Sequence, residues 1–218
     1  MGEVTRLARS TDRRRPSAAD DRRAAILGAV EELLRERPLE DISVSDIATA
    51  ADVGRSGFYF YFANKGAAVS ALLGEVFDQI LSGADALFGE LRSSRAPADV
   101  VHSALSWTWR SWQQHQSLIL AMIDARGIDA GVREQWDAWN DRFTGPVVAA
   151  AIAGEHGRGR RTEAELRELV EALVGANERA FERLSRSGAG PAQIDRTLDA
   201  LTTLWCAALS RPEKGHRA

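Results

Sequence analysis

The 218-residue sequence has one cysteine, two methionines and no long apolar run. The single thiol, Cys206, cannot form an internal disulfide, and no Cys/His cluster has the spacing of a zinc site. The longest apolar run, residues 147–153, is too short to span a bilayer, and no apolar segment follows the N-terminal arginines as in a signal peptide. These absences predict a cytoplasmic protein with no metal, no cofactor and no membrane partner.

Catalytic signatures are also missing. The four histidines are scattered, and the sequence contains no HExxH, P-loop or GxGxxG motif. The segment GRSGF lacks the GxSxG spacing of a nucleophile elbow. We therefore do not expect an enzyme.

Net charge is only −3, but the charge is unevenly distributed. Residues 1–15 contain five arginines and two acidic residues, so this arm has a net charge of +3. The rest of the chain then has a net charge of −6, which gives the total of −3. A basic arm beside an acidic body suits attraction to phosphate at one end of the protein. A solvated, disordered tail explains the arm at least as well.

Nearly the whole chain has the 3.6-residue periodicity of amphipathic helices, and strand patterns are almost absent. Two interruptions stand out, the loop 154–161 and the glycine-rich stretch 185–191. The sequence therefore predicts an all-α fold. Helices are expected at about 22–37, 44–51, from 55, 65–87, 97–115, 117–126, 129–153, 162–185 and 191–210.

Two short helices near the N-terminus have the pattern of a helix-turn-helix. Ser43 and Asp46 form a capping-box pattern that starts one helix, and Asp52-Val53-Gly54 allows a tight turn before the next. The second helix of such a pair can enter the major groove of DNA. Simple packing within an all-α protein accounts for this pattern equally well.

The five residues from Phe58 to Phe62 are all aromatic. A short helix cannot bury five consecutive rings, so some must face solvent or a partner. Phe58 and Phe62 lie four residues apart and are expected to pack inward, whereas the hydroxyls of Tyr59 and Tyr61 are suited to phosphate oxygens. Lys65, at the start of the next helix, combines a cation with free backbone amides and also suits a phosphate.

The segment DISVSDIATAADVGRSGFYFYFANK resembles the DNA-binding domain of the TetR family, and the match extends over about residues 20–75. The resemblance implies that Tyr59 and Lys65 hold backbone phosphate. It also implies that Arg55, Ser56 and Gly57 face the major groove. Ser43 and Val44 would lie near the other DNA strand of the site.

Three residues depart from the pattern of that family. Asp52 replaces the usual turn glycine, Gly54 replaces a Ser/Thr cap, and Gly57 stands where threonine or alanine is common. Aspartate tolerates the left-handed conformation and glycine tolerates the cap position, so the fold should be retained.

All six tryptophans lie after residue 100, which points to a cavity lined by rings, although a plain aromatic core is the alternative for each. Asn177 falls on an apolar stripe, where it bonds either a backbone carbonyl or a ligand. Asn177-Glu178-Arg179 with Phe181 resembles the EthR branch of the TetR family, which implies a ligand tunnel. The candidate lining residues are Trp107, Trp109, Trp112, Trp139, Phe143, Asn177, Phe181 and Trp205.

The resemblance further implies a homodimer made by the last two helices, with stripes at Leu169, Leu173, Leu198, Leu201 and Ala208. We expect a flexible arm (1–19), a helix-turn-helix domain (20–66), a ligand-binding and dimerisation domain (67–211) and a tail (212–218). The predicted function is repression from a palindromic operator, relieved by a small apolar ligand. The alternative is a ligand-binding or dimerisation module that has weakened or lost DNA recognition.

Overall fold

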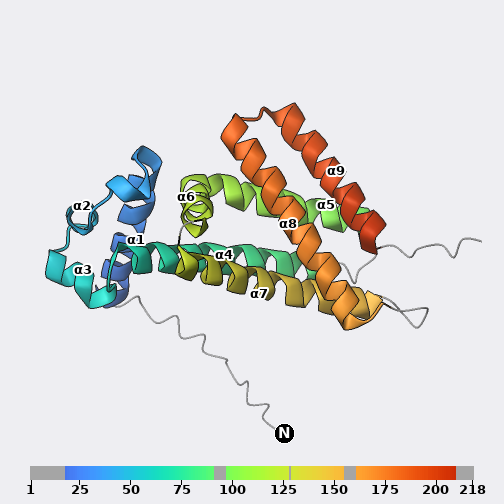
Figure 1. Ribbon diagram of the computed structural model, residues 1–218, viewed down its shortest axis with the longest axis horizontal. Coiled ribbons are helices and arrows are strands. Elements are labelled where there is room, and N and C mark those ends of the chain that lie inside the picture. The colour runs from blue at the N-terminus through green and yellow to red at the C-terminus, as the bar shows by residue number, and fades with distance from the viewer. Residues whose placement is uncertain (1–17, 91–96, 128, 155–160, 210–218) are drawn as a thin grey trace, which may run out of the picture.

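The computed structural model describes residues 18–90, 97–127, 129–154 and 161–209 (Figure 1). Within these ranges the chain is helical and contains no strand, as the periodicity predicts. The predicted arm, except for Ala18 and Ala19, and the predicted tail lie outside the described residues. The elements are α1 (Ala18–Glu36), η1 (Leu39–Asp41), α2 (Val44–Ala50), α3 (Arg55–Tyr61), α4 (Lys65–Glu90), α5 (Pro97–Gln114), α6 (Gln116–Arg126), α7 (Ala130–Gly154), α8 (Glu163–Ser187) and α9 (Pro191–Leu209).

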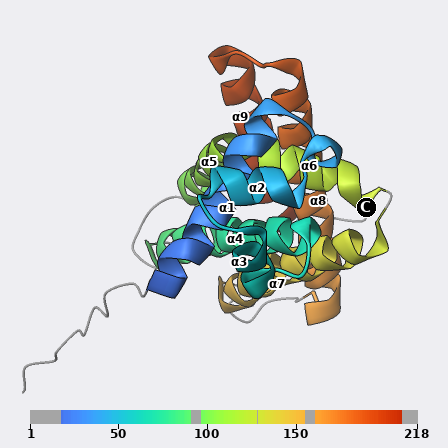
Figure 2. The ribbon, with the colours of Figure 1, turned by 90° about the vertical axis from the view of Figure 1, so that its left-hand side faces the viewer.

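The N-terminal unit consists of α1, α2 and α3, packed against the start of α4. Ile26, Val30, Ile47 and Phe58 are completely buried and form its centre. α1 begins four residues before its expected start at Arg22, and two aspartates in its first turn are favourable near the positive end of the helix dipole. Figure 2, which looks onto this end of the molecule, shows α2 and α3 in front of the remaining helices.

Both local predictions for the helix-turn-helix are confirmed. The Ser43 hydroxyl accepts a hydrogen bond from the Asp46 backbone amide, and the Asp46 carboxylate accepts one from the Ser43 backbone amide, so the capping box is complete. In the turn, Asp52 has a φ of 53°, the left-handed value expected where the family has glycine. The polypeptide thus reverses between α2 and α3 without a glycine at that position.

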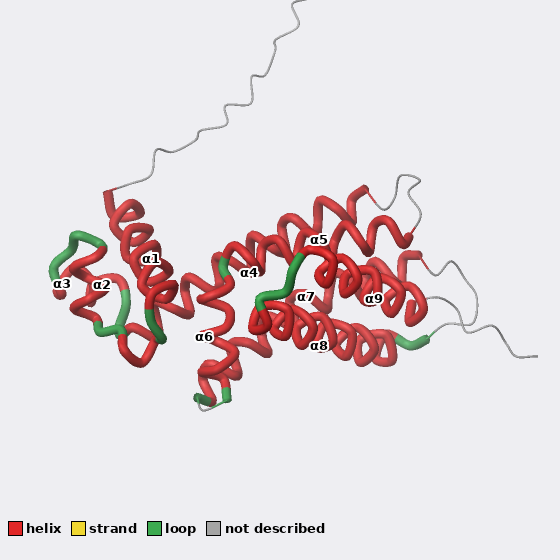
Figure 3. Tube along the Cα trace, turned by 90° about the horizontal axis from the view of Figure 1, so that it is seen from above, coloured by secondary structure: helices red, strands yellow, loops and turns green. Residues whose placement is uncertain are grey.

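The larger C-terminal unit is built from α4 to α9. α4 and α7 lie alongside each other, α5 packs between α4 and α9, and α8 and α9 form an antiparallel pair (Figures 1 and 3). Thr162 and Glu165 form a second capping box at the start of α8, and Gly188 ends that helix with a φ of 61°. Among the described residues, no helix is long and apolar enough to cross a membrane.

The leucines predicted to form the dimer contact belong instead to the core of the single chain. Leu173, Leu198 and Leu201 are only 4%, 5% and 7% exposed, and Leu169 and Ala208 pack against the same core. The apolar stripes of α8 and α9 face each other and α5, because these helices must first bury their own apolar faces. The outward faces of α8 and α9 carry other residues, which include Leu204 at 45% exposure.

Candidate DNA-binding surface and ligand cavity

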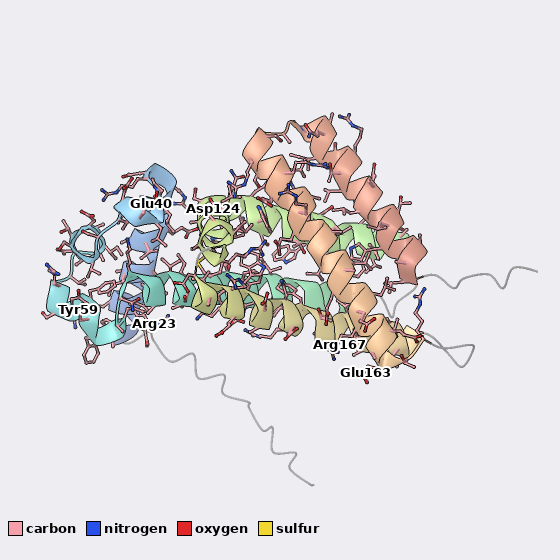
Figure 4. All side chains as sticks on the ribbon, in the orientation of Figure 1. Arg23, Glu40, Tyr59, Asp124, Glu163 and Arg167 are labelled. Carbon is pink, nitrogen blue, oxygen red and sulfur yellow. The ribbon has the colours of Figure 1, made fainter. Side chains whose placement is uncertain are left out.

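Helix α3 has one buried face and one exposed face. Phe58 is completely buried and Phe62 is 6% exposed, and their ring centroids lie 5.9 Å apart, as the four-residue spacing predicts. Tyr59 and Phe60 are 49% and 78% exposed. Figure 4 labels Tyr59 on α3, at the end of the molecule away from α8 and α9. The helix is therefore anchored by Phe58 and Phe62 and presents Tyr59 and Phe60 outward.

The orientation of this helix is supported by α1 and α4. The guanidinium of Arg23 lies 5.7 Å from the centroid of the Phe62 ring and forms an ion pair with Glu75. A cation over the face of an aromatic ring is attracted by the ring quadrupole. Arg23 thus connects α1, the residue that ends α3, and α4.

The residues predicted to contact DNA have different degrees of exposure. Arg55 and Ser56 are exposed on the first turn of α3, whereas Gly57 and Tyr61 are half-buried. Across the turn, Ser43 is exposed, but its hydroxyl also donates to the Asp46 carboxylate at 2.8 Å. Val44 and Tyr61 are half-buried, with side chains packed against the core.

The ammonium of Lys65 forms hydrogen bonds within the protein. Its ammonium Nζ donates to the backbone carbonyls of Leu39, Glu40 and Ile42 at 2.7, 3.3 and 2.8 Å. An ammonium has three N–H donors, so these three acceptors use all of them. Lys65 thus binds the η1 turn to the start of α4, which favours a positioning role over the predicted contact with phosphate. The sequence does not reveal this contact, because the carbonyls belong to a turn more than 20 residues earlier.

An apolar cavity of about 290 Å³ lies in the C-terminal unit, among α4, α5, α6, α7, α8 and α9. Aliphatic and aromatic side chains form most of its wall, and a few polar groups interrupt it. Its lining residues are Phe77, Ile80, Leu81, Val101, Ala104, Leu105, Thr108, Trp112, Ile119, Trp136, Asn140, Phe143, Pro146, Val147, Ala150, Ala151, Val174, Asn177, Glu178, Phe181, Trp205 and Leu209.

Five of the eight predicted lining residues are part of this wall, namely Trp112, Phe143, Asn177, Phe181 and Trp205. The other three tryptophans lie outside it. Trp109 packs against Phe181 at 5.3 Å between centroids, and Trp139 stacks on Phe77 at 5.0 Å, so both support the wall from behind. Trp107 donates from Nε1 to the carbonyl of Ile80.

Three indoles in the wall all donate to side chains of α8. Trp112 donates to Ser185 Oγ at 3.0 Å, Trp136 to Glu178 Oε2 at 2.9 Å, and Trp205 to Asn177 Oδ1 at 3.0 Å. These tryptophans belong to α5, α7 and α9 respectively. The indole N–H groups, which need partners when buried, therefore connect three helices to α8.

The side-chain amide of Asn177 has its oxygen engaged and its nitrogen free of hydrogen bonds to the described residues. Its Oδ1 accepts from Trp205, which fixes the orientation of the amide, and its Nδ2 has no hydrogen-bond partner in the parts of the chain that the structure describes. The sequence predicts that Asn177 bonds either a backbone carbonyl or a ligand. Its oxygen instead accepts a hydrogen bond from the indole of Trp205. The nitrogen remains available to the cavity.

Several wall residues are not predictable from the sequence. Trp136 shares a stripe with Trp139 and Phe143, yet only the structure shows that Trp136 lines the cavity. Glu178 directly follows Asn177, and it forms an ion pair with Arg126, whose guanidinium lies 4.8 Å from the Trp136 ring centroid. Among the described residues no group of His, Cys, Asp or Glu could hold a metal ion.

A helix-turn-helix with an exposed second helix, joined to a helical domain with an apolar cavity, is the arrangement of a one-component transcriptional regulator. Comparisons with known proteins agree. The family model "Bacterial regulatory proteins, tetR family" matches residues 26–72, and "Transcriptional regulator EthR, C-terminal domain" matches residues 101–210. The HTH-type transcriptional regulator EthR of Mycobacterium tuberculosis is 33% identical over 208 residues, 93% of each chain. The protein of the same name from Mycolicibacterium smegmatis is 29% identical, over 92% of this chain and 91% of that one.

The fold is also that of solved regulators. A putative TetR-family transcriptional regulator from Syntrophomonas wolfei superposes with a TM-score of 0.73 at 17% identity, over 89% of this chain and 98% of that one. The chain belongs to the TetR family of transcriptional regulators and is of the EthR type. It is therefore a DNA-binding regulator and not an enzyme.

Proposed function

We propose that this regulator represses transcription as a homodimer on a two-fold symmetric operator, and that a small apolar ligand in the cavity releases it from DNA. The observation that carries the DNA-binding part is the exposed face of α3, held in place by the fully buried Phe58. Recognition helices of this kind place their first residues against base edges in the major groove.

The role of each residue is assigned from the family resemblance together with its chemistry. Arg55 and Ser56 are exposed on the first turn of α3 and are assigned to base edges, with Gly57 allowing close approach. Tyr59 and Tyr61 are assigned to phosphate through their hydroxyls. Ser43 and Val44, at the start of α2, are assigned to the neighbouring strand of the site, where Lys65 supports them indirectly by fixing η1.

The ligand proposed for the cavity is a mainly apolar molecule with a hydrogen-bond acceptor such as a carbonyl oxygen. The free Nδ2 of Asn177 supplies the matching donor. Asn140 also lines the cavity, and its side-chain amide makes no hydrogen bond to the residues described, so it offers a second polar contact. Pockets for small molecules typically combine an apolar wall with a few such groups, and their volumes begin at roughly 300 Å³.

The outward faces of α8 and α9 support dimerisation. Small exposed residues on these faces, Ala172, Gly175, Thr203 and Ala207, allow two helix pairs to approach closely, and Leu204 is exposed beside them. Leu204→Asp should therefore give a monomer in sedimentation velocity. Ile152→Asp is the control, since Ile152 is an exposed aliphatic residue on α7. Equal effects of the two variants would contradict this interface.

The proposed response to ligand is differential binding. The dimer has one conformation in which its two recognition helices fit successive major grooves and another in which they do not. A ligand shifts the equilibrium between these conformations only if it binds the second one more tightly than the first. The connecting helix α4 begins beside α3 and also contributes Phe77 and Ile80 to the cavity wall, so it belongs to both parts of the molecule.

The DNA-binding part is tested with a gel-shift titration on DNA from the promoter of its own gene. Affinity should fall steeply with salt, because neutralised phosphates release counterions. Tyr59→Phe should weaken binding to all sequences alike, whereas Arg55→Ala should change sequence preference. Arg110→Ala, an exposed arginine on α5, is the control and should bind as wild type. Absent or salt-insensitive binding would favour a ligand-binding module instead.

The ligand-binding part is tested by quenching of tryptophan fluorescence with a library of apolar ketones and amides. Asn177→Leu should lose affinity for compounds that carry a carbonyl and retain affinity for matched hydrocarbons. Ser185→Ala is the control, because it also removes an indole acceptor from α8 but does not line the cavity. Equal losses in both variants would indicate that wall rigidity, not the amide donor, determines affinity.

A further inference from the structure

Phe60 is the most exposed of the large hydrophobic side chains that the structure describes, at 78%. It belongs to α3, one turn after the exposed Ser56, so the two residues share the outward face of that helix. Its ring contacts Tyr61 edge-to-face, with centroids 5.0 Å apart and planes at 82°. Phe60 therefore lies beside residues assigned to DNA, yet it has no polar group with which to bind a phosphate or a base edge.

Neither the ligand cavity nor the protein core accounts for this exposed ring. Phe60 does not line the cavity, and α3 lies at the opposite end of the molecule from α8 and α9 (Figure 1). It also makes no contribution to the buried core, which Phe58 and Phe62 supply from the other face. The exposed part of such a phenyl ring gains free energy only when a partner removes it from water.

DNA has one apolar group on the floor of the major groove, the C5-methyl group of thymine. A helix of seven residues is about 10 Å long, which is close to the groove width of about 12 Å, so the second turn of α3 remains within reach of base edges. We propose that Phe60 is a specificity-determining residue that binds thymine methyl groups in the major groove. This inference rests on the proposed placement of α3 in that groove.

Phe60 and the hydrogen-bonding residues of α3 then have complementary tasks. Arg55 and Ser56 read donors and acceptors on the first turn, and Phe60 reads a methyl group on the second. The ring contacts Tyr61 edge-to-face, and Tyr61 itself packs against the core. The operator should accordingly contain thymine on the side of each half-site that faces the end of α3.

The test uses two versions of one promoter fragment, amplified with either thymidine or deoxyuridine triphosphate. Uracil lacks only the C5-methyl group and pairs identically. Wild-type protein should bind the uracil fragment more weakly, by about fourfold for each methyl group that Phe60 buries. Phe60→Ala should bind the thymine fragment more weakly than wild type and should not distinguish the two fragments. Tyr59→Phe is the matched control and should still distinguish them.

Two results would overturn the inference. One is equal affinity of the wild type for both fragments; the other is a preference for thymine that Phe60→Ala retains in full. The melting temperature of Phe60→Ala should equal that of the wild type, because a side chain with 78% exposure contributes little to the core. If wild-type protein shows no salt-dependent affinity for either fragment, the proposed placement of α3 fails instead, which separates the two failures.

Discussion

Replacing Lys65 with methionine separates a positioning role from a phosphate-binding role. Methionine keeps the length and apolar stem of the side chain but removes the ammonium. The carbonyls of Leu39, Glu40 and Ile42 then lose the donor that lies 2.7 to 3.3 Å away in the wild type. These carbonyls surround η1, which leads directly into Ser43 and the start of α2. Loss of the ammonium should therefore loosen the segment that precedes the helix-turn-helix.

The size of the effect follows from the chemistry of the contact. A hydrogen bond to a charged group contributes about 1.5–3 kcal/mol, and two of the three bonds of Lys65, to Leu39 and Ile42, lie in part-buried surroundings. Lys65 is half-buried, so water replaces part of what is lost, and we expect about 2 kcal/mol for the three bonds together. For a chain of this size such a loss lowers the melting temperature by roughly 4–8 °C.

The decisive assay is the salt dependence of operator binding between about 50 and 200 mM salt. A lysine that binds phosphate adds about 0.9 to the slope of log K against log salt concentration, whereas a positioning lysine adds nothing. Lys65→Met should therefore reduce affinity without changing the slope. Arg55→Met is the comparison variant, since Arg55 is exposed, forms no ion pair within the described ranges and is assigned to base edges: it should change sequence preference, whereas Lys65→Met should weaken binding to all sequences alike. An unchanged melting temperature with a slope reduced by about 0.9 per subunit would refute this reasoning.

Two glycines and two helix caps provide further tests. Gly83→Ala should destabilise the protein by about 1–3 kcal/mol in thermal unfolding, because the new Cβ would lie 2.2 Å from the Trp107 indole, and an unchanged melting temperature would contradict this close packing. Gly57→Ala should instead stabilise α3 by up to about 1 kcal/mol, since its Cβ would meet only an ordinary contact at 3.6 Å; a lower melting temperature would oppose this. The pKa values of Asp46 and Glu165 are lowered, chiefly by the hydrogen bond from the backbone amide of each N-cap residue. Each cap therefore stabilises the folded protein fully at pH values above the unfolded pKa of its carboxyl group. This stabilisation is lost as the pH falls through the lower folded pKa. Circular dichroism should therefore show helix loss below about pH 4, and Asp46→Asn should remove part of that pH dependence.

The helices and caps could be predicted from sequence because the forces that determine them are local. Ser43 and Asp46 are three residues apart, and each satisfies the free amide of the other whatever the rest of the chain does. Likewise, the four-residue spacing of Phe58 and Phe62 places both on one face of a short helix. The sequence thus predicts which face of a helix is buried.

What buries that face depends on distant residues, and here prediction from sequence failed. Trp136 and Trp139 lie on one stripe of α7, but Phe77 of α4 stacks on Trp139 and leaves Trp136 to line the cavity. The family resemblance implies a dimer contact at Leu173 and Leu198, yet both pack within one chain, because an apolar stripe does not specify its partner. A rotation of one helix about its axis determines each outcome, and periodicity contains no information on that rotation.

Two helices connect the cavity to the DNA-binding unit. The connecting helix α4 contacts both α1 and the cavity wall, and helix α6 does so as well. At the end of α6, Arg126 pairs with the cavity residue Glu178, and at its start His115 Nδ1 lies 2.6 Å from Glu31 Oε1 of α1. Since α6 and α4 both contact α1, the proposed ligand response would reach α1 through both helices if the ligand displaced Glu178. Any rotation of the DNA-binding unit must then satisfy both contacts at once, which favours two discrete arrangements over a continuous range.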